Sequence, residues 1–136
     1  MLNIRRAGPK DIPAILDLVK LLDLAYPAQS FKNFRVAEAN GEIVGLADLE
    51  EFADFFFLSS VGVAAKSQKQ GIAAALLNKI LGGLKKDVYL YTTIPDFFRR
   101  FGFKIVPTWP PYLPPKETFS CRECTPETCV CMVKKP

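Results

Sequence analysis

Residues 55–81 read Phe55-Phe-Phe-Leu-Ser-Ser-Val-Gly-Val63, then Ala64-Ala-Lys-Ser-Gln-Lys-Gln70, then Gly71-Ile-Ala-Ala-Ala-Leu-Leu-Asn-Lys-Ile-Leu81. The first segment is apolar and aromatic and predicts a buried strand, and the third repeats apolar residues at helical spacing. The polar loop between them ends where the helix begins, so unpaired amides and the positive end of the helix dipole face one point. Phosphate oxygens are natural occupants of such a point.

The side chains around this loop suit a phosphate ligand. Gly71 and Ala73 let backbone amides approach a diphosphate closely, while Lys66 and Lys69 add positive charge. No acidic residue occurs from Phe55 to Lys86, so the cationic field is local. On spacing alone, an ordinary strand-to-helix connection explains the loop equally well.

The segments before this stretch predict a helix and a hairpin. Asp11 is placed to cap a helix with proline in its first turn, and apolar residues then recur at helical spacing over about 12–24. Asn40-Gly41 predicts a tight turn between strands at 34–39 and 43–49.

The segments after it alternate strand and helix. Short strands are predicted at 88–92 and 103–106, with a short helix at 95–100 between them. Five of the nine residues from Pro107 to Pro115 are proline, which excludes regular structure there. A last strand is predicted at 130–133.

Composition limits the classes of function. The chain has 136 residues, 49% of them hydrophobic, which fits one compact domain over 1–136 with a proline-rich, cysteine-containing tail at 107–136. The net charge of +4 is too small to imply nucleic-acid binding. The absence of histidine removes hydrolase mechanisms that need an imidazole base.

The termini and the cysteines bear on location. The N-terminus lacks an apolar signal core, and no apolar run approaches the length of a membrane span, so we expect neither export nor membrane insertion. All four cysteines lie between Cys121 and Cys131, which is not the pattern of a secreted disulfide framework. The sequence therefore favours a cytoplasmic protein.

Two ordered motifs resemble the GNAT acyltransferase family. The family's acetyl-CoA loop, Gln or Arg, two residues, Gly, one residue, then Gly or Ala, is matched by Gln68-Lys-Gln-Gly71-Ile-Ala73. The second motif, a strand and then an aromatic short helix ending in Gly-Phe, is matched by Val88-Tyr-Leu-Tyr-Thr-Thr93 and Phe97-Phe98-Arg-Arg-Phe-Gly102-Phe103. Ile4-Arg-Arg-Ala7 resembles the family's first strand. The resemblance implies an α/β (α+β) fold with a mixed, mostly antiparallel central sheet, splayed between its fourth and fifth strands and flanked by helices.

By this resemblance the protein is an acetyl-CoA-dependent N-acetyltransferase acting on a primary amine of a small molecule. The pantetheine arm is expected to bond main chain near Val61 and Val63, where Gly62 eases close approach. A main-chain N–H near Val61, at a bulge, is expected to polarise the thioester carbonyl. Phe98 stands where the family has a tyrosine that returns a proton to the CoA thiolate. The residues expected to bind the cofactor are Val61, Gly62, Val63, Gln68, Lys69, Gln70, Gly71, Ile72, Ala73 and Phe98.

The groups that move protons are marked less clearly. The family usually takes the acceptor's proton with a carboxylate. Glu50 and Glu51 are the candidates because the strand at 55–63 contains none, although both also fit solvated charges at a strand end. Tyr91 is the candidate acid, although a core aromatic with a satisfied hydroxyl explains it as well. The catalytic candidates are therefore Val61, Tyr91, Glu50 and Glu51.

The acceptor is predicted from a resemblance and its departures. The C-terminal third resembles short prokaryotic N-acetylglutamate synthase-like proteins, which implies an amino acid such as glutamate. Phe57 and Ser59, however, replace a Glu and an Arg that those relatives commonly carry. A site without a clear base favours an α-amine, about one-seventh deprotonated at pH 7, over lysine, which is deprotonated in fewer than about one in a thousand molecules. The connection at 25–33 is short for the family and predicts an open or differently covered substrate side.

Alternatives remain at two points. Instead of an enzyme, the chain fits a non-catalytic acetyl-CoA- or CoA-binding regulatory module, because Phe98 cannot donate a proton and no base is evident. The tail fits four thiolates on zinc, one or two disulfides, or free thiols, at Cys121, Cys124, Cys129 and Cys131. A metal module on a vestigial scaffold is a third class. The expected partners are acetyl-CoA and a small amine, with a homodimer left open and neither nucleic acid nor membrane.

Overall fold

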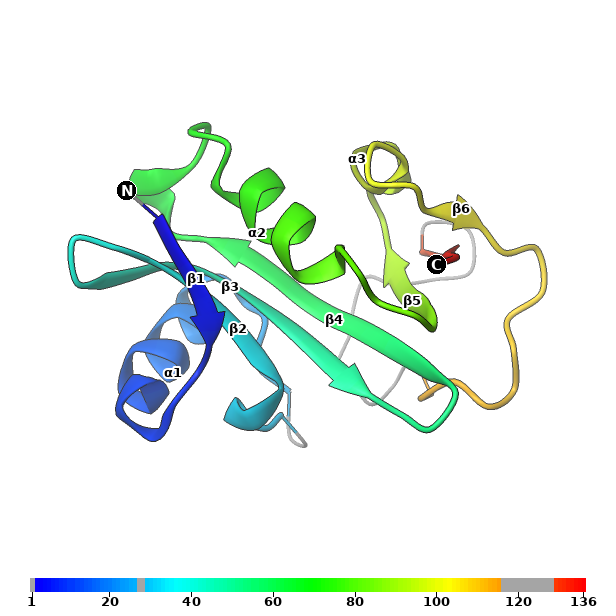
Figure 1. The fold of residues 1–136 in the computed structure, drawn as a ribbon, viewed down its shortest axis with the longest axis horizontal. Helices are drawn as coiled ribbons and strands as arrows, with labels where there is room; N and C mark the ends of the chain where they lie inside the picture. Colours follow the sequence, from blue (N-terminus) through cyan, green and yellow to red (C-terminus); the bar gives the residue numbers. More distant parts are fainter. Residues whose placement is uncertain (1, 27–28, 116–128) are drawn as a thin grey trace.

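A seven-stranded sheet with helices on both faces runs through the computed structural model, which describes residues 2–26, 29–115 and 129–136 (Figure 1). The strand order is β1-β2-β3-β4-β5-β7-β6. Neighbouring strands are antiparallel except β4 and β5, which are parallel. The predicted mixed, mostly antiparallel sheet is therefore confirmed.

The helices and strands follow the predicted order along the chain. Their bounds are β1 Leu2–Arg6, α1 Ile12–Leu21, β2 Phe34–Ala39, β3 Glu42–Glu51, β4 Phe55–Val63, α2 Ile72–Leu81, β5 Asp87–Thr92, α3 Pro95–Arg99, β6 Lys104–Ile105 and β7 Val130–Lys134. Short 3-10 turns precede α1, β2 and α2. No helix or strand occurs from 107 to 115, as the prolines predicted.

Two details of the first half differ from the prediction. The helix α1 ends at Leu21 instead of near Leu24, because Asp23 is left-handed (φ 57°) and the Leu24 N–H donates back to the Val19 carbonyl at 2.8 Å. Asp11 is at the predicted N-cap position, but its side chain does not cap α1. It accepts hydrogen bonds from the Gly8 N–H and from Arg5 instead.

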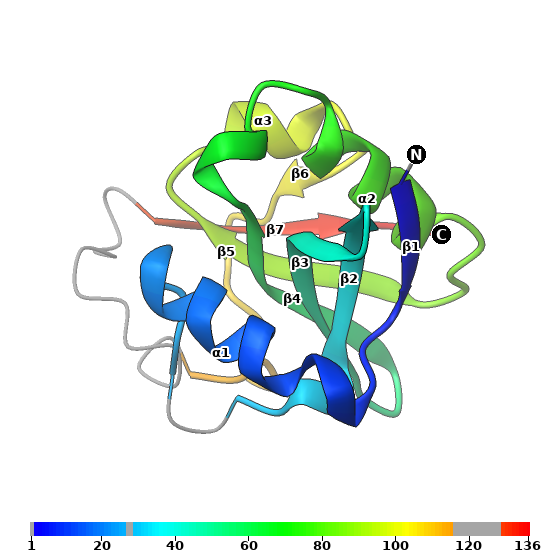
Figure 2. The ribbon, with the colours of Figure 1, turned by 90° about the vertical axis from the view of Figure 1, so that its left-hand side faces the viewer.

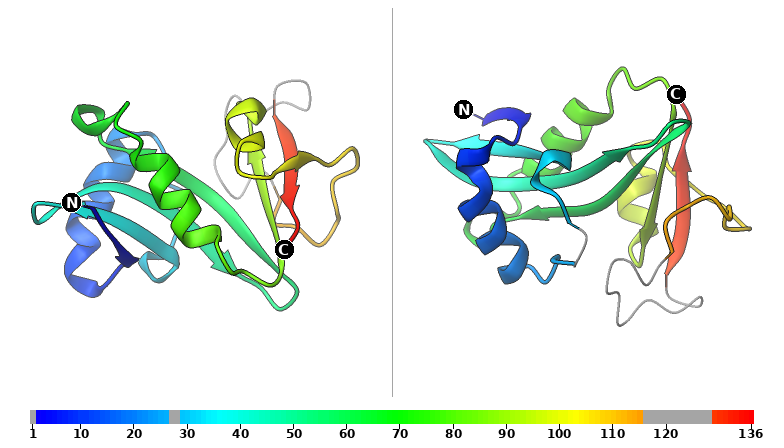
Figure 3. Two further views of the ribbon diagram at one scale, coloured as in Figure 1. Left: turned by 45° about the horizontal axis from the view of Figure 1, so that its top comes forward. Right: turned by 90° about the horizontal axis from the view of Figure 1, so that it is seen from below.

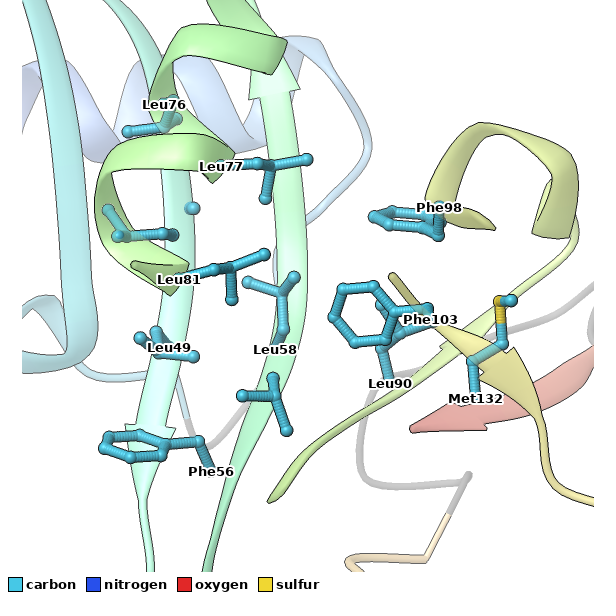
Figure 4. Close-up of a cluster of buried hydrophobic side chains, with 13 residues drawn as sticks. Leu49, Phe56, Leu58, Leu76, Leu77, Leu81, Leu90, Phe98, Phe103 and Met132 are labelled. Atoms are coloured by element: carbon cyan, nitrogen blue, oxygen red, sulfur yellow. The ribbon is translucent and has the colours of Figure 1, made fainter. Parts of the chain in front are cut away.

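The helices cover opposite faces of the sheet because alternate strand residues point to opposite faces. Leu46 of β3 packs with α1, whereas Leu49, three positions on, packs under α2. Figure 2 shows α1 on one side of the strands and α2 with α3 on the other. Figure 4 shows one group of side chains between α2 and β3–β4, and a second group, including Phe98 and Met132, between α3 and β5–β7.

The sheet splits between β4 and β5. The parallel pairing joins only three residues of each strand, from Phe55↔Asp87 to Phe57↔Tyr89. Beyond that point β4 stays paired with β3 while β5 pairs with β7, so the sheet divides into two parts (Figure 3). The predicted splay between the fourth and fifth strands is confirmed.

The proline-rich segment 107–115 packs on the α1 face of the second part. Trp109 stacks on Tyr91 with ring centroids 4.7 Å apart, and Leu113 is buried beside Phe55 and Tyr89. Figure 2 shows this segment passing below the sheet on the side of α1. Among the described residues, none of the helices has the length and apolarity that a bilayer-crossing helix requires.

Candidate active site at the split in the sheet

The loop before α2 presents backbone N–H groups at the open end of the split. The first hydrogen bond of α2 runs from the Ala75 N–H to the Gly71 carbonyl, so the N–H groups before it have no acceptor within the helix. Gly71 is left-handed (φ 77°), a conformation that favours glycine, and a Cβ there would meet nothing within 4 Å. The side-chain amide of Gln68 donates to the Val63 carbonyl at 3.0 Å and ties the loop to β4.

A cleft of about 300 Å³ lies at this point. Its walls are Val63, most of residues 67–74, and two residues of the α3 region, Phe97 and Arg100. Six residues of the predicted cofactor set line it: Val63, Gln68, Lys69, Gly71, Ile72 and Ala73. Four further residues line the cleft without having been predicted: Ser67, Ala74, Phe97 and Arg100. Phe97 and Arg100 lie within the quoted aromatic motif, so that motif was the available signal.

Four residues of the predicted set lie outside this cleft, and the structure gives a reason for two of them. Phe98 is 7% exposed and packs in the core against Phe97 and Phe103, so it is the neighbouring Phe97 that reaches the cleft. The missing side chain of Gly62 faces α1: a Cβ there would lie 2.6 Å from Leu22. The close approach that this glycine permits is therefore that of Leu22 and Leu24, which follow the end of α1. Val61 and Gln70 are also absent from the lining.

The two lysines of the loop differ in their surroundings. Lys69 lines the cleft in a left-handed conformation (φ 64°). Lys66 contacts both carboxylate oxygens of Glu42 at 2.7 Å on the exposed surface. Of the two charges predicted for a phosphate, the structure therefore brings Lys69 to the cleft and pairs Lys66 elsewhere.

One main-chain edge of β4 faces the split without a partner strand among the described residues. Parallel pairing with β5 stops at Phe57, while pairing with β3 continues to Val63. The register also shifts along this stretch: Asp48 is opposite Ser60 and Leu49 is opposite Leu58, which leaves Ser59 as a bulge. The bulge lies two residues before Val61, near where the resemblance predicted one.

Three polar side chains meet at this bulge on the α1 face. Tyr26, from the connection after α1, donates its hydroxyl proton to Asp48 Oδ2 in a short hydrogen bond. Ser59 Oγ lies 3.2 Å from the same tyrosine oxygen. Tyr26 thus covers part of the α1 face at the bulge, and the predicted open or differently covered substrate side stays a prediction.

Asp48 is the most unusual of the three. Its side chain is 0% exposed, and Oδ1 has no hydrogen-bond partner among the residues that the structure describes. Burial raises the pKa of its carboxyl, against smaller lowering effects of Tyr26, Ser59 and Gln29. Burial, with the adjacent Asp48, also raises the pKa of the Tyr26 hydroxyl.

The sequence contains one indication that Asp48 is unusual. Asp48 is a lone acidic residue within the apolar run of β3, and a polar residue at a buried position often marks a functional site. No comparable signal marks Tyr26.

The residues predicted to carry protons, Tyr91, Glu50 and Glu51, lie in surroundings that differ from one another. The Tyr91 hydroxyl donates to the Pro114 carbonyl at 2.6 Å. Glu51 pairs with Lys86 at 2.8 Å, which lowers the pKa of its carboxyl. Burial, then Asp48, raises the pKa of Glu50. Glu50 shares the α1 face with Asp48, two positions away on β3, and is opposite Phe57.

The cysteine tail lies largely outside the described residues. Cys121 and Cys124 fall within 116–128, while Cys129 and Cys131 are buried at β7. Burial raises the pKa of the Cys131 thiol to about 12, which keeps it protonated. Within 2–26, 29–115 and 129–136 no group of three metal-ligating side chains occurs, so nothing in these ranges supports the zinc interpretation.

A split sheet, a helix N-terminus at its open end and an unpaired strand edge inside it are the features that the resemblance to the GNAT family implied. The sequence model of the acetyltransferase (GNAT) domain matches residues 30–105, more than half of the chain. The chain belongs to the GNAT acetyltransferase family.

Solved structures share this fold at low identity. An N-acetylglutamate synthase from Neisseria gonorrhoeae, complexed with coenzyme A and N-acetyl-glutamate, superposes with a TM-score of 0.76 and 22% identity over 98% of this chain and 35% of that chain. Rv2747 from Mycobacterium tuberculosis, in complex with CoA and NLQ, gives 0.74 and 23% over 98% and 99%. Diaminobutyrate acetyltransferase EctA from Paenibacillus lautus gives 0.69 and 17% over 100% and 95%. The chain spans about a third of the length of the N-acetylglutamate synthase chains it matches.

Proposed function

We propose that the chain is an acetyl-CoA-dependent N-acetyltransferase that transfers the acetyl group to the primary amine of a small, amino-acid-like molecule. The observation that carries this proposal is the coincidence of three features at one place. The cleft below the α2 N-terminus, the unpaired edge of β4 and the polar cluster at the Ser59 bulge all border the split in the sheet.

The cofactor side follows from main-chain chemistry. The diphosphate would accept hydrogen bonds from the N–H groups before Ala75, with Lys69 and Arg100 adding positive charge. The amide groups of the pantetheine arm would pair with the edge of β4 beyond Phe57, as a strand would. This path leads the thioester toward the bulge at Ser59, where a main-chain N–H near Val61 would polarise the carbonyl.

Transfer then needs an amine that has lost a proton. The amine nitrogen attacks the thioester carbon, the oxygen takes the negative charge, and the intermediate collapses with loss of the CoA thiolate. The α1 face presents Glu50, Tyr26 and Ser59 to an incoming amine, with the Asp48 carboxylate buried behind Tyr26, whereas the opposite face is filled by α2. We therefore expect the acceptor to enter from the α1 face.

The side chain of the acceptor is expected to be neutral or apolar. On this face Phe57 packs against the Tyr91 ring at 4.9 Å, and Tyr91 stacks on Trp109. These rings offer no cation to a second carboxylate, so glutamate is expected to be a poorer acceptor than a neutral amino acid. EctA and N-acetylglutamate synthase, which share the fold, were solved with L-2,4-diaminobutyric acid and N-acetyl-glutamate, which supports an amino-acid-like acceptor but not the neutral side chain.

The test is an acceptor panel with acetyl-CoA. Neutral amino acids, glutamate, diaminobutyrate, short peptides and a blocked lysine are incubated with the protein, and free thiol and acetylated product are measured. Product from one or more α-amines, exceeding that from the blocked lysine, supports the proposal. CoA binding by calorimetry with no thiol release from any amine would leave the regulatory-module alternative.

A further inference from the structure

The acetyl transfer proposed above gives the Asp48 carboxylate no function, although its burial is unfavourable in free energy. A buried carboxylate with one oxygen lacking a partner loses solvation without full compensation. Asp48 Oδ1 is in that position among the described residues, although its Oδ2 accepts the Tyr26 hydroxyl proton. Taking up a proton would relieve the cost, because a neutral carboxyl has less charge to solvate.

The direction of the hydrogen bonds defines a chain of three groups. A tyrosine hydroxyl has one proton, and Tyr26 gives it to Asp48 Oδ2. Ser59 Oγ, at 3.2 Å from the Tyr26 oxygen, is therefore the donor in that pair. The order is Ser59 to Tyr26 to Asp48, with the serine at the bulge and the carboxylate in the interior.

The outer end of this chain borders the split. Ser59 and Tyr26 are both half-buried, whereas Asp48 is fully buried. Ser59 is two residues beyond Phe57, where β4 loses its β5 partner. An amine held at the split therefore meets the two hydroxyls before it meets the carboxylate.

We propose that Tyr26 and Asp48 form a proton relay that deprotonates the acceptor ammonium, with Ser59 orienting the tyrosine hydroxyl. This inference rests on the proposed function. The ammonium gives one proton to the Tyr26 oxygen as the tyrosine passes its own proton to Asp48 Oδ2, which leaves neutral amine, unchanged tyrosine and neutral Asp48. The amine forms the C–N bond, the C–S bond breaks, and the sulfur keeps that electron pair and takes a second proton from nitrogen. After the product leaves, Asp48 passes its proton back to the Tyr26 oxygen as the tyrosine releases its own proton to solvent at the split.

In this mechanism Tyr26 is the catalytic residue, and Asp48 acts through it. The other polar or charged groups around Asp48 are Gln29 from the connection after α1, Glu50 on β3 and Arg35 on β2. Gln29 and Arg35 are the smallest of the effects that lower the pKa of Asp48. Burial, and after it Asp48, raises the pKa of the Glu50 carboxyl. Neither Glu51, paired with Lys86, nor Tyr91, bonded to Pro114, belongs to this chain.

The test compares Tyr26→Phe and Asp48→Asn with the wild-type chain across pH, using the best acceptor from the panel. Near neutral pH, kcat/KM is expected to fall by about 100-fold or more in each variant, the range found for a lost general base. The wild-type profile declines at pH values below the raised pKa of Asp48 and stays nearly level from there up to the pKa of the amine. In both variants the rate instead rises about tenfold per pH unit, since only amine already deprotonated in solution reacts.

Two further variants sharpen the comparison. The double variant is expected to lose no more than either single variant, because both residues serve one step. Tyr112→Phe is the matched control: its hydroxyl pairs with Tyr89 at 2.8 Å, within the aromatic cluster beside Phe55. It is expected to leave the profile unchanged. CoA affinity, measured by calorimetry, should be the same in every variant.

The outcomes separate the relay from the proposed function. A loss that is equal at every pH, or a wild-type profile in both variants, overturns the relay while the acetyltransferase stands. If the wild-type chain acetylates no amine, both proposals fall. If Asp48→Asn does not fold, Tyr26→Phe decides alone, since it keeps the ring and removes only the hydroxyl.

Discussion

The two sides of the split sheet are built in different ways. On the α2 side, the proposed cofactor site consists of backbone N–H groups, a left-handed glycine and a strand edge, all within residues 57–75. On the α1 side, the polar cluster joins Tyr26, Asp48 and Ser59, which come from a loop and two strands. The main-chain site is formed by one continuous stretch of sequence. The side-chain site forms only when elements that are distant in the sequence come together in the fold. The following predictions test this contrast.

The largest effect is expected at the start of α2. Gly71→Asp places a negative charge at the helix N-terminus and is expected to weaken CoA binding by about 100-fold or more, measured by calorimetry. Gly83→Asp is the matched control, because Gly83 is also left-handed with open space around it, but follows the C-terminal end of α2. It is expected to change CoA affinity by less than about threefold. Equal losses would mean that backbone strain, and not charge, disturbs binding.

A substitution at Gly62 tests whether this glycine of β4 makes room for the residues after α1 or for the cofactor. Gly62→Val would press on Leu22 and Leu24, 2.6 and 2.8 Å from its Cβ, so the free energy of unfolding is expected to fall by about 1–3 kcal/mol. Urea melts measure this, with CoA affinity as the second readout. Weaker CoA binding at unchanged stability would instead show that the glycine makes room for the cofactor.

Two carboxylates near α1 are expected to act on stability with opposite signs. Hydrogen bonds from Arg5 lower the pKa of Asp11 to about 2. At pH values above the usual pKa of aspartate, this pair therefore adds up to about 2 kcal/mol to the free energy of unfolding. The contribution disappears as the pH falls toward 2. Asp11→Asn should therefore lower Tm at neutral pH and not at pH 2.

Asp48 gives the opposite case. Because the pKa of Asp48 is raised in the folded protein, its contribution to stability is largest at pH values below the usual pKa of aspartate. The contribution is lost as the pH rises through the pKa that Asp48 has in the folded protein. Asp48→Asn is expected to keep or raise Tm by a few degrees at neutral pH, and this gain should vanish in acid. A large loss of Tm at neutral pH would assign Asp48 a structural role.

The smallest effects distinguish the two lysines of the loop. Lys69→Ala is expected to weaken CoA binding by about threefold to tenfold at low salt and less at high salt, because Lys69 lines the cleft. Lys66→Ala should change it by less than about twofold, since Lys66 is held by Glu42 on the surface. Calorimetry at two ionic strengths measures both, and equal effects would indicate a diffuse field.

The sequence was most informative where a local rule acts. Asn40-Gly41 gave the hairpin, Gly71 gave the start of α2 and the prolines gave the irregular segment at 107–115. The predicted single domain and the role of a Val61 N–H stay predictions. The site candidates chosen by position along the chain, Glu50, Glu51 and Tyr91, illustrate the limit, because sequence position says nothing about a hydroxyl's partner 23 residues away.

The amino-acid sequence by itself determined the order of elements, the phosphate-type loop and the family, because these depend on turn chemistry, helix termini and periodicity within short windows. Only the tertiary structure decided that Gly62 faces α1, that Lys66 is paired with Glu42, and that Tyr26 and Ser59 meet over Asp48. The physical reason is the register of β3 against β4. A one-residue shift at Ser59 brings the two hydroxyls and the buried carboxylate together; the resemblance predicted a bulge nearby, but no spacing rule along the chain places Tyr26 and Asp48 beside it.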